Sequence, residues 1–119
     1  WAAAGQPMES IAEQIDETTP RVAVLGASPD LLAVEVRGSS MNLIAPEGSY
    51  AVYDPNDRAL VDRKYYLFLV DGEVTFKRYR DAGGPPRLEP ESTEDHEIIF
   101  PKGEIRVIGR VIEVVRRLP

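Results

Sequence analysis

Short stretches of apolar and β-branched residues alternate with turn-forming residues along most of this chain. Residues 32–36 alternate between apolar and other side chains, and residues 50–53 form a second short run that ends at Asp54-Pro55-Asn56. A period of two is typical of strands, because successive side chains point to opposite faces of a sheet. Residues 105–115 are rich in β-branched side chains, which also favour a strand. The pattern therefore predicts a mostly β fold of short strands.

A β-hairpin is the clearest local prediction. Residues 65–70 form an apolar, aromatic run, and Asp71-Gly72, a favoured two-residue turn, follows it. The return strand covers 73–79, so the turn places Tyr66 opposite Lys77. One face of the hairpin then carries Lys77, Thr75, Tyr66 and Phe68, and the other carries Leu67, Leu69, Val74 and Phe76. Because both faces are apolar, we expect Lys77 to be at least partly buried.

The rest of the chain divides into a polar leading segment and one domain. Residues 1–30 are polar and irregular, and residues 31–119 suffice for one domain with little room for a second. Within that domain, residues 87–89 predict a further short strand and residues 91–97 an acidic loop. The chain begins with Trp1 rather than methionine, so we expect it to be part of a longer protein.

Composition narrows the classes of function. A hydrophobic content of 43% with 29% charged residues is typical of a soluble globular protein. The net charge of −6 argues against binding to a nucleic-acid backbone by this segment, because such binding needs clustered Lys and Arg. No apolar run reaches the roughly 18–20 residues that a membrane span requires. The absence of cysteine fits a reducing compartment, so we expect a cytoplasmic protein without membrane contact.

Two residues are candidates for nucleophilic catalysis. Ser40 follows Gly38, whose conformational freedom allows a sharp turn after the preceding strand. A serine hydroxyl needs a nearby base, and the chain has one histidine and no cysteine, so Lys77 is the simplest base available. Ser39 is the rival nucleophile. His96 lies in the acidic loop among Glu94, Asp95 and Glu97, where a solvated turn is the usual structure, so we predict no metal site.

Three motifs in order carry a resemblance to a known family. Ala3-Ala4-Gly5-Gln6-Pro7 comes first, Gly38-Ser39-Ser40-Met41 follows about 35 residues later, and Glu73-Val74-Thr75-Phe76-Lys77-Arg78 comes third. This order and spacing resembles the family of self-cleaving serine peptidases that includes LexA, phage repressors and UmuD. The resemblance covers the chain from Ala2 to about Val115. It implies a LexA-like catalytic domain of short, highly twisted strands.

The resemblance also assigns roles to individual residues. It implies that Ser40, directly before the methionine, is the nucleophile, that Lys77 is the general base, and that the bond between Ala4 and Gly5 is cleaved. Gly38, Met41 and Thr75 support the pair. Residues 1–30 then form the cleavage-site segment and linker, and residues 31–119 form a Ser–Lys peptidase and dimerisation domain that needs no cofactor or metal. Lys77 must lose its proton to act, so its pKa has to fall from about 10.4 toward about 7–8, and desolvation would lower it.

The same resemblance implies partners in a bacterial cytoplasm. A RecA filament on single-stranded DNA would stimulate cleavage in the DNA-damage response, and operator DNA would be bound only through an N-terminal domain outside this sequence. We expect a homodimer through residues near Arg106 to Val114, because we expect the 105–115 strand to be left exposed and prone to pairing. A UmuD-like polymerase accessory protein and a catalytically silent dimerisation module are the alternatives.

Two positions depart from the family pattern. Asn42-Leu43-Ile44 stands where a proline commonly follows Ser-Met, and Gly48-Ser49 stands where Gly-Asp is usual. The second departure leaves the role of that aspartate open. Neither change affects Ser40 or Lys77.

Overall fold

The computed structural model describes residues 30–116 and residue 118, and this part of the chain is built from β-strands. The mostly β prediction is therefore confirmed. The six strands are β1 (Leu32–Glu35), β2 (Tyr50–Asp54), β3 (Tyr65–Val70), β4 (Glu73–Arg80), β5 (Arg87–Glu89) and β6 (Arg106–Val115). Across the described residues, no helix has the length and apolarity that a membrane span requires.

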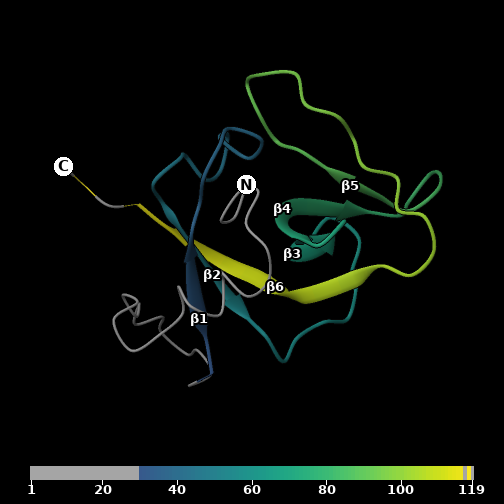
Figure 1. Ribbon diagram of the computed structural model, residues 1–119, viewed down its shortest axis with the longest axis horizontal. Coiled ribbons are helices and arrows are strands. Elements are labelled where there is room, and N and C mark those ends of the chain that lie inside the picture. Colours follow the sequence, from purple (N-terminus) through teal and green to yellow (C-terminus); the bar gives the residue numbers. More distant parts are fainter. Residues whose placement is uncertain (1–29, 117, 119) are drawn as a thin grey trace.

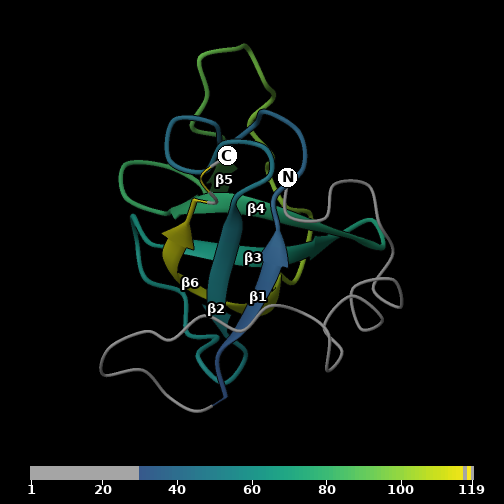
Figure 2. The same ribbon diagram turned by 90° about the vertical axis from the view of Figure 1, so that its left-hand side faces the viewer.

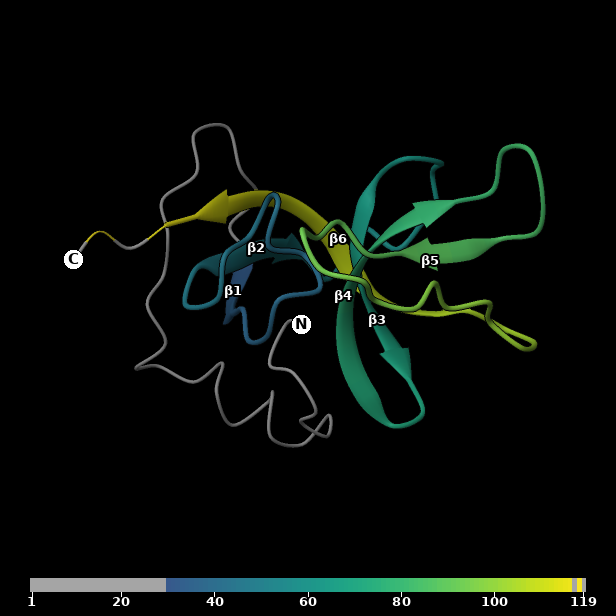
Figure 3. The same cartoon turned by 90° about the horizontal axis from the view of Figure 1, so that it is seen from above.

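The strands form one antiparallel sheet in the order β1-β2-β6-β3-β4-β5. β6 joins two groups of strands, with β1 and β2 on one side and β3, β4 and β5 on the other (Figures 1 and 3). The sheet twists strongly along β6, so that β1 and β2 lie crosswise to the β3–β4 hairpin (Figure 2). This twist lets side chains of distant strands meet in one core.

The prediction that the 105–115 strand is left exposed and prone to pairing is wrong in that β6 is not an edge strand. β6 lies inside the sheet, where Arg110 and Val111 pair with both β2 and β3. The physical reason is that β6 is apolar on both of its faces, and each face has a core to cover. Among the described residues, Arg106, Val107 and Gly109 pair with β3 alone and Glu113 to Val115 pair with β2 alone, so each end of β6 has one open side.

Gly109 lies where β6 passes from one group of strands to the other. A Cβ atom at this position would lie 2.5 Å from the carbonyl oxygen of Asp54 and 2.9 Å from the ring of Tyr53. Real Cβ atoms do not approach backbone this closely, so the crossing of β2 and β6 requires a glycine.

Two clusters of buried side chains cover opposite faces of the hairpin. The first contains Leu67, Val74 and Phe76 of the hairpin, together with Met41 and residues of β1, β2 and β6. The second contains Tyr66, Phe68, Tyr79 and Leu88. The predicted hairpin register is confirmed, because Val70 pairs with Glu73 and Tyr66 with Lys77. Lys77 thus belongs to the face of the second cluster.

Candidate active site

Ser40 lies in a tight turn between β1 and β2, which we call the serine turn (residues 37–49). Val36 closes its base, donating its N–H to Ser49 O at 2.8 Å and accepting from Gly48 N at 2.9 Å. Gly38 has a φ of 81°, which glycine adopts without strain. Met41 is fully buried in the first core cluster, so the residue next to Ser40 anchors the turn in the interior.

Lys77 meets this turn at the edge of β4, in the part of the strand that β5 does not cover. β5 pairs with Arg78 to Arg80 only, so Lys77 is the first β4 residue beyond the β5 ladder. Its Nζ atom lies 2.8 Å from the Oγ atom of Ser40. The exposed fraction is 2% for Lys77 and 1% for Ser40. The expected burial of Lys77 is confirmed, and the two residues that the sequence paired are in hydrogen-bond contact.

Two further contacts orient the amine. Nζ of Lys77 donates to Oγ1 of Thr75 at 3.1 Å and to the carbonyl oxygen of Phe76 at 3.0 Å. The carbonyl oxygen of Phe76 can only accept, and the hydroxyl of Thr75, which can donate or accept, accepts from Nζ here. A neutral amine that donates both N–H groups in this way keeps its lone pair for the hydroxyl of Ser40. This arrangement would allow Lys77 to accept the proton of Ser40.

Burial also sets the protonation of this amine. Desolvation lowers the pKa of Lys77 from 10.5 to about 8. The physical cause is that the low-dielectric interior disfavours the ammonium form. The neutral amine is therefore more accessible near physiological pH than it is for an exposed lysine.

Ser40 and Lys77 open into a pocket of about 400 Å³. Besides these two residues, its lining consists of Val70, Asp71, Glu73, His96, Glu97 and Ile99. The hairpin supplies one wall and the 91–97 loop the other. A peptide segment that enters this pocket would pass directly over the hydroxyl of Ser40.

The 91–97 loop is the part of the site that sequence reasoning missed. The sequence predicts a solvated acidic turn, but Glu91 donates its N–H to the carbonyl oxygen of Ser40 at 2.9 Å. His96 is partly buried, and its Nε2 atom lies 3.0 Å from Oγ of Ser39. Ser39 also donates to the carboxylate of Glu94. No local pattern could reveal these contacts, because the loop lies some 50 residues from the serine turn along the chain.

The remaining predicted residues fall into three groups. Ser39, the rival nucleophile, directs its hydroxyl to the 91–97 loop rather than to Lys77. Ser49, which replaces the usual aspartate, is buried and donates to the carbonyl oxygen of Pro46 at 2.5 Å, so it stabilises the end of the serine turn. The proposed scissile residues Ala4 and Gly5 lie outside the described residues.

This chain is similar to known proteins over most of its length. The sequence profile of the family described as Peptidase S24-like matches residues 1–112. The chain is 32% identical over 116 residues to the LexA repressor of Acidiphilium cryptum, covering 97% of this chain and 50% of that protein. It is 32% identical to the LexA repressor of Granulibacter bethesdensis, covering 97% of this chain and 48% of that protein. The LexA repressor of Cereibacter sphaeroides is 30% identical, with coverage of 96% and 51%.

The match to the family extends over almost all of this chain, whereas the chain spans about half the length of the curated relatives it matches. The shared part includes the serine turn and the hairpin that carry Ser40 and Lys77. This chain belongs to the Peptidase S24-like family of serine peptidases.

Proposed function

We propose that this chain is the C-terminal catalytic and dimerisation domain of a LexA-like or prophage transcriptional repressor that cleaves its own chain between Ala4 and Gly5. The observation that carries the proposal is the 2.8 Å contact between Lys77 Nζ and Ser40 Oγ in a buried site. The likeness to LexA repressors supports the repressor context. Both residues act within one peptidase reaction.

The reaction follows from the two side chains. Neutral Lys77 takes the proton of Ser40, and the Oγ atom attacks the carbonyl carbon of Ala4. Backbone N–H groups of the serine turn stabilise the oxyanion that forms. The C–N bond then breaks, the amino group of Gly5 takes the proton from Lys77, and Ala4 remains as an ester on Ser40. Water hydrolyses this ester with Lys77 again acting as the base.

The position of the target on the same chain has an energetic consequence. Attack on a tethered bond is unimolecular, and correct orientation of the reacting groups can remove several kcal/mol from the barrier. Cleavage is then limited by how often residues 4 and 5 occupy the pocket. A RecA filament on single-stranded DNA would stimulate the reaction by stabilising that bound conformation.

The proposed partners follow from the same context. Operator DNA would be bound by a domain outside this sequence, because the net charge of −6 disfavours phosphate contacts here. Two copies would pair through the carboxyl end of β6, where Ile112 is 45% exposed. A two-fold dimer would let two DNA-binding domains address two half-sites. The curated relatives are LexA repressors, which favours this function over a UmuD-like polymerase subunit.

Incubation of the purified chain at alkaline pH tests the proposal directly. We expect intact-mass spectrometry to show loss of residues 1–4, with a rate that is independent of protein concentration. A chain that stays intact from neutral to alkaline pH, while remaining folded, would instead support the catalytically silent dimerisation module. A rate that rises with concentration would contradict attack within one chain.

A further inference from the structure

The backbone of Glu91 binds the serine turn at two points. Its N–H donates to the carbonyl oxygen of Ser40 at 2.9 Å, and its carbonyl oxygen accepts from Leu43 N at 3.1 Å. The same N–H lies 3.3 Å from the Sδ atom of Met41. Ser40 and Leu43 are therefore both held in position relative to Glu91. Movement of Glu91 would move the carbonyl of Ser40 with it.

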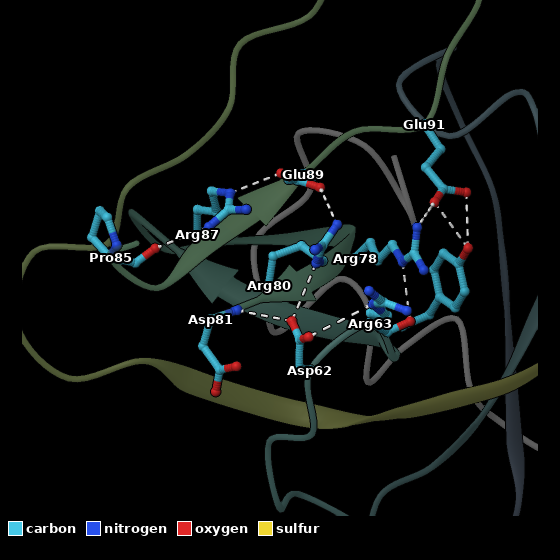
Figure 4. A network of polar contacts seen from close by, with 10 residues as sticks. Asp62, Arg63, Arg78, Arg80, Asp81, Pro85, Arg87, Glu89 and Glu91 are labelled. Atoms are coloured by element: carbon cyan, nitrogen blue, oxygen red, sulfur yellow. Dashed lines mark hydrogen bonds and ion pairs between the residues drawn. The ribbon is translucent and has the colours of Figure 1, made fainter. Parts of the chain in front are cut away.

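The side chain of Glu91 is in turn held by the hairpin. Arg78 donates from Nη1 to Oε1 of Glu91 at 3.0 Å, and the hydroxyl of Tyr65 donates to the same carboxylate at 2.8 and 3.0 Å (Figure 4). The Arg78 guanidinium lies 5.6 Å from the ring centroid of Tyr65, and its Nε donates to the carbonyl oxygen of Arg63 at 3.1 Å. Arg78 thus has several contacts that fix its orientation before it meets Glu91.

Arg78 directly follows Lys77 on β4, so the two side chains point to opposite faces of the strand. Lys77 contacts the hydroxyl of Ser40, and Arg78 contacts the residue that holds the backbone of Ser40. Consecutive residues of one strand therefore determine the position of both halves of the reacting pair. The pairing of β4 with β3 and β5 fixes the positions of Lys77 and Arg78 in the sheet.

We propose that Arg78, Glu91 and Tyr65 are positioning residues that hold the 91–97 loop against the serine turn and thereby fix Ser40 Oγ against Lys77 Nζ. This inference rests on the proposed function of Ser40 and Lys77. The ion pair is partly exposed, with side-chain exposures of 28% for Arg78 and 20% for Glu91. Pairs of this kind contribute little to overall stability, so its loss should act on site geometry more than on folding.

Release of the 91–97 loop, which contributes His96 and Glu97 to the pocket lining, would also expose the pocket to water. Lys77 would then be less desolvated, and its pKa would rise toward the ordinary value. The other titratable groups that line the pocket are Asp71 and Glu73 of the hairpin, and His96 and Glu97 of the loop. None of these four groups is substituted in the variants compared below, although His96 and Glu97 would move with the loop.

The experiment measures self-cleavage of the full chain against pH for Arg78→Ala, Glu91→Ala, the double variant and Arg80→Ala. Arg80 is the matched control, because it lies on the same face of β4 with similar exposure but pairs with Asp62 and Glu89 (Figure 4). We expect the plateau rate to fall about tenfold or more in both single variants and their pH midpoint to rise, because a small misplacement of reacting groups costs this much. Arg80→Ala should keep the wild-type profile.

The double variant tests whether the two residues act as one unit. A shared role predicts that it is no slower than either single variant, whereas independent roles predict that the losses multiply. Glu91→Gln still accepts from Arg78 and should recover part of the rate. If Arg78→Ala does not fold, Arg78→Lys, which keeps the charge and loses the planar guanidinium, takes its place.

Failure of the positioning role and failure of the proposed function give different results. Equal plateau rates and pH midpoints in Arg78→Ala and Arg80→Ala would overturn the positioning role and leave the proposed function standing. If the wild-type chain does not cleave, the proposed function fails, and NMR titration of the Lys77 side chain then decides this inference. A midpoint higher in Arg78→Ala than in Arg80→Ala supports it, and an unchanged midpoint overturns it.

Discussion

Nζ of Lys77 lies 2.8 Å from Oγ of Ser40, although 37 positions separate the two residues along the chain. Two local structures create this contact: a turn anchored by buried Met41 and a hairpin whose register buries Lys77. The surrounding core brings the two together. The contact therefore depends on the whole sheet rather than on one motif.

Removal of either reacting group should abolish cleavage between Ala4 and Gly5. We expect Ser40→Ala and Lys77→Ala to remain folded and to show no loss of residues 1–4 by mass spectrometry after alkaline incubation. Ser39→Ala is the matched control, because Ser39 contacts Glu94 and His96 instead of Lys77. Cleavage that persists in Ser40→Ala, or that stops in Ser39→Ala alone, would contradict the assignment.

The cleavage rate should depend on pH through Lys77. Only the neutral amine can accept the proton of Ser40, and the pKa of Lys77 is about 8. We therefore expect the rate to rise with pH up to about pH 8 and to level off above it. Initial rates across a series of buffers give the midpoint. A rate that does not change between about pH 6 and pH 10, a range that includes both a shifted and an ordinary lysine, would exclude Lys77 as the base.

The free energy of unfolding should also depend on pH through Lys77. The pKa of Lys77 is about 8 in the folded state against 10.5 without burial, so between these values the unfolded chain binds more protons. Raising the pH through this window therefore stabilises the fold, by about 3 kcal/mol in total. Urea unfolding of Ser40→Ala, with and without Lys77→Met, measures the difference at each pH. We expect the free energy of unfolding of the variant that keeps Lys77, relative to the Lys77→Met variant, to increase from pH 7 to pH 11. A constant difference would contradict the lowered pKa of Lys77.

Gly109→Ala should destabilise the domain. The added Cβ would lie 2.5 Å from Asp54 O, so β2 or β6 must shift. Overpacking of this kind typically costs about 1–3 kcal/mol. The free energy of unfolding in urea gives the magnitude. An unchanged unfolding midpoint would show that the crossing of β2 and β6 can relax without cost.

A homodimer through the carboxyl end of β6 should be sensitive to Ile112. A charge buried in an interface without a partner is costly, so Ile112→Asp should weaken self-association by at least about tenfold. Val61→Asp is the matched control, because Val61 has the same exposed fraction of 45% in another part of the surface. Sedimentation equilibrium measures both variants. Equal dissociation constants for the two variants would place the interface elsewhere. A monomeric wild type would contradict the homodimer.

The sequence was sufficient for the hairpin because its information is local. Asp71-Gly72 determines the turn, the turn determines the register, and the register determines which face carries Lys77. The burial of Lys77 followed from apolar residues on both faces. The pairing of Ser40 with Lys77 needed the family resemblance, since nothing in either segment points to the other.

One wrong prediction and one omission have physical causes. The pattern of β6 showed apolar residues on both faces, but a strand pattern does not reveal its neighbours, and the exposed edge was inferred wrongly. The turn around His96 is largely exposed, as predicted, but the contacts between the 91–97 loop and the serine turn were missed because the loop is polar. Polar residues look the same in sequence whether water or a distant partner satisfies them, and the partner of Glu91 is Arg78.

The alternation of Lys77 and Arg78 across β4 limits where this domain can change in length. An insertion or deletion of one residue between the Asp71-Gly72 turn and Lys77 would exchange their faces, turning the amine away from Ser40 and the guanidinium away from Glu91. Residues 81–86 follow both side chains and are exposed throughout. Inserted segments, such as an affinity tag or a reporter loop, are therefore best placed there, where neither residue changes its face.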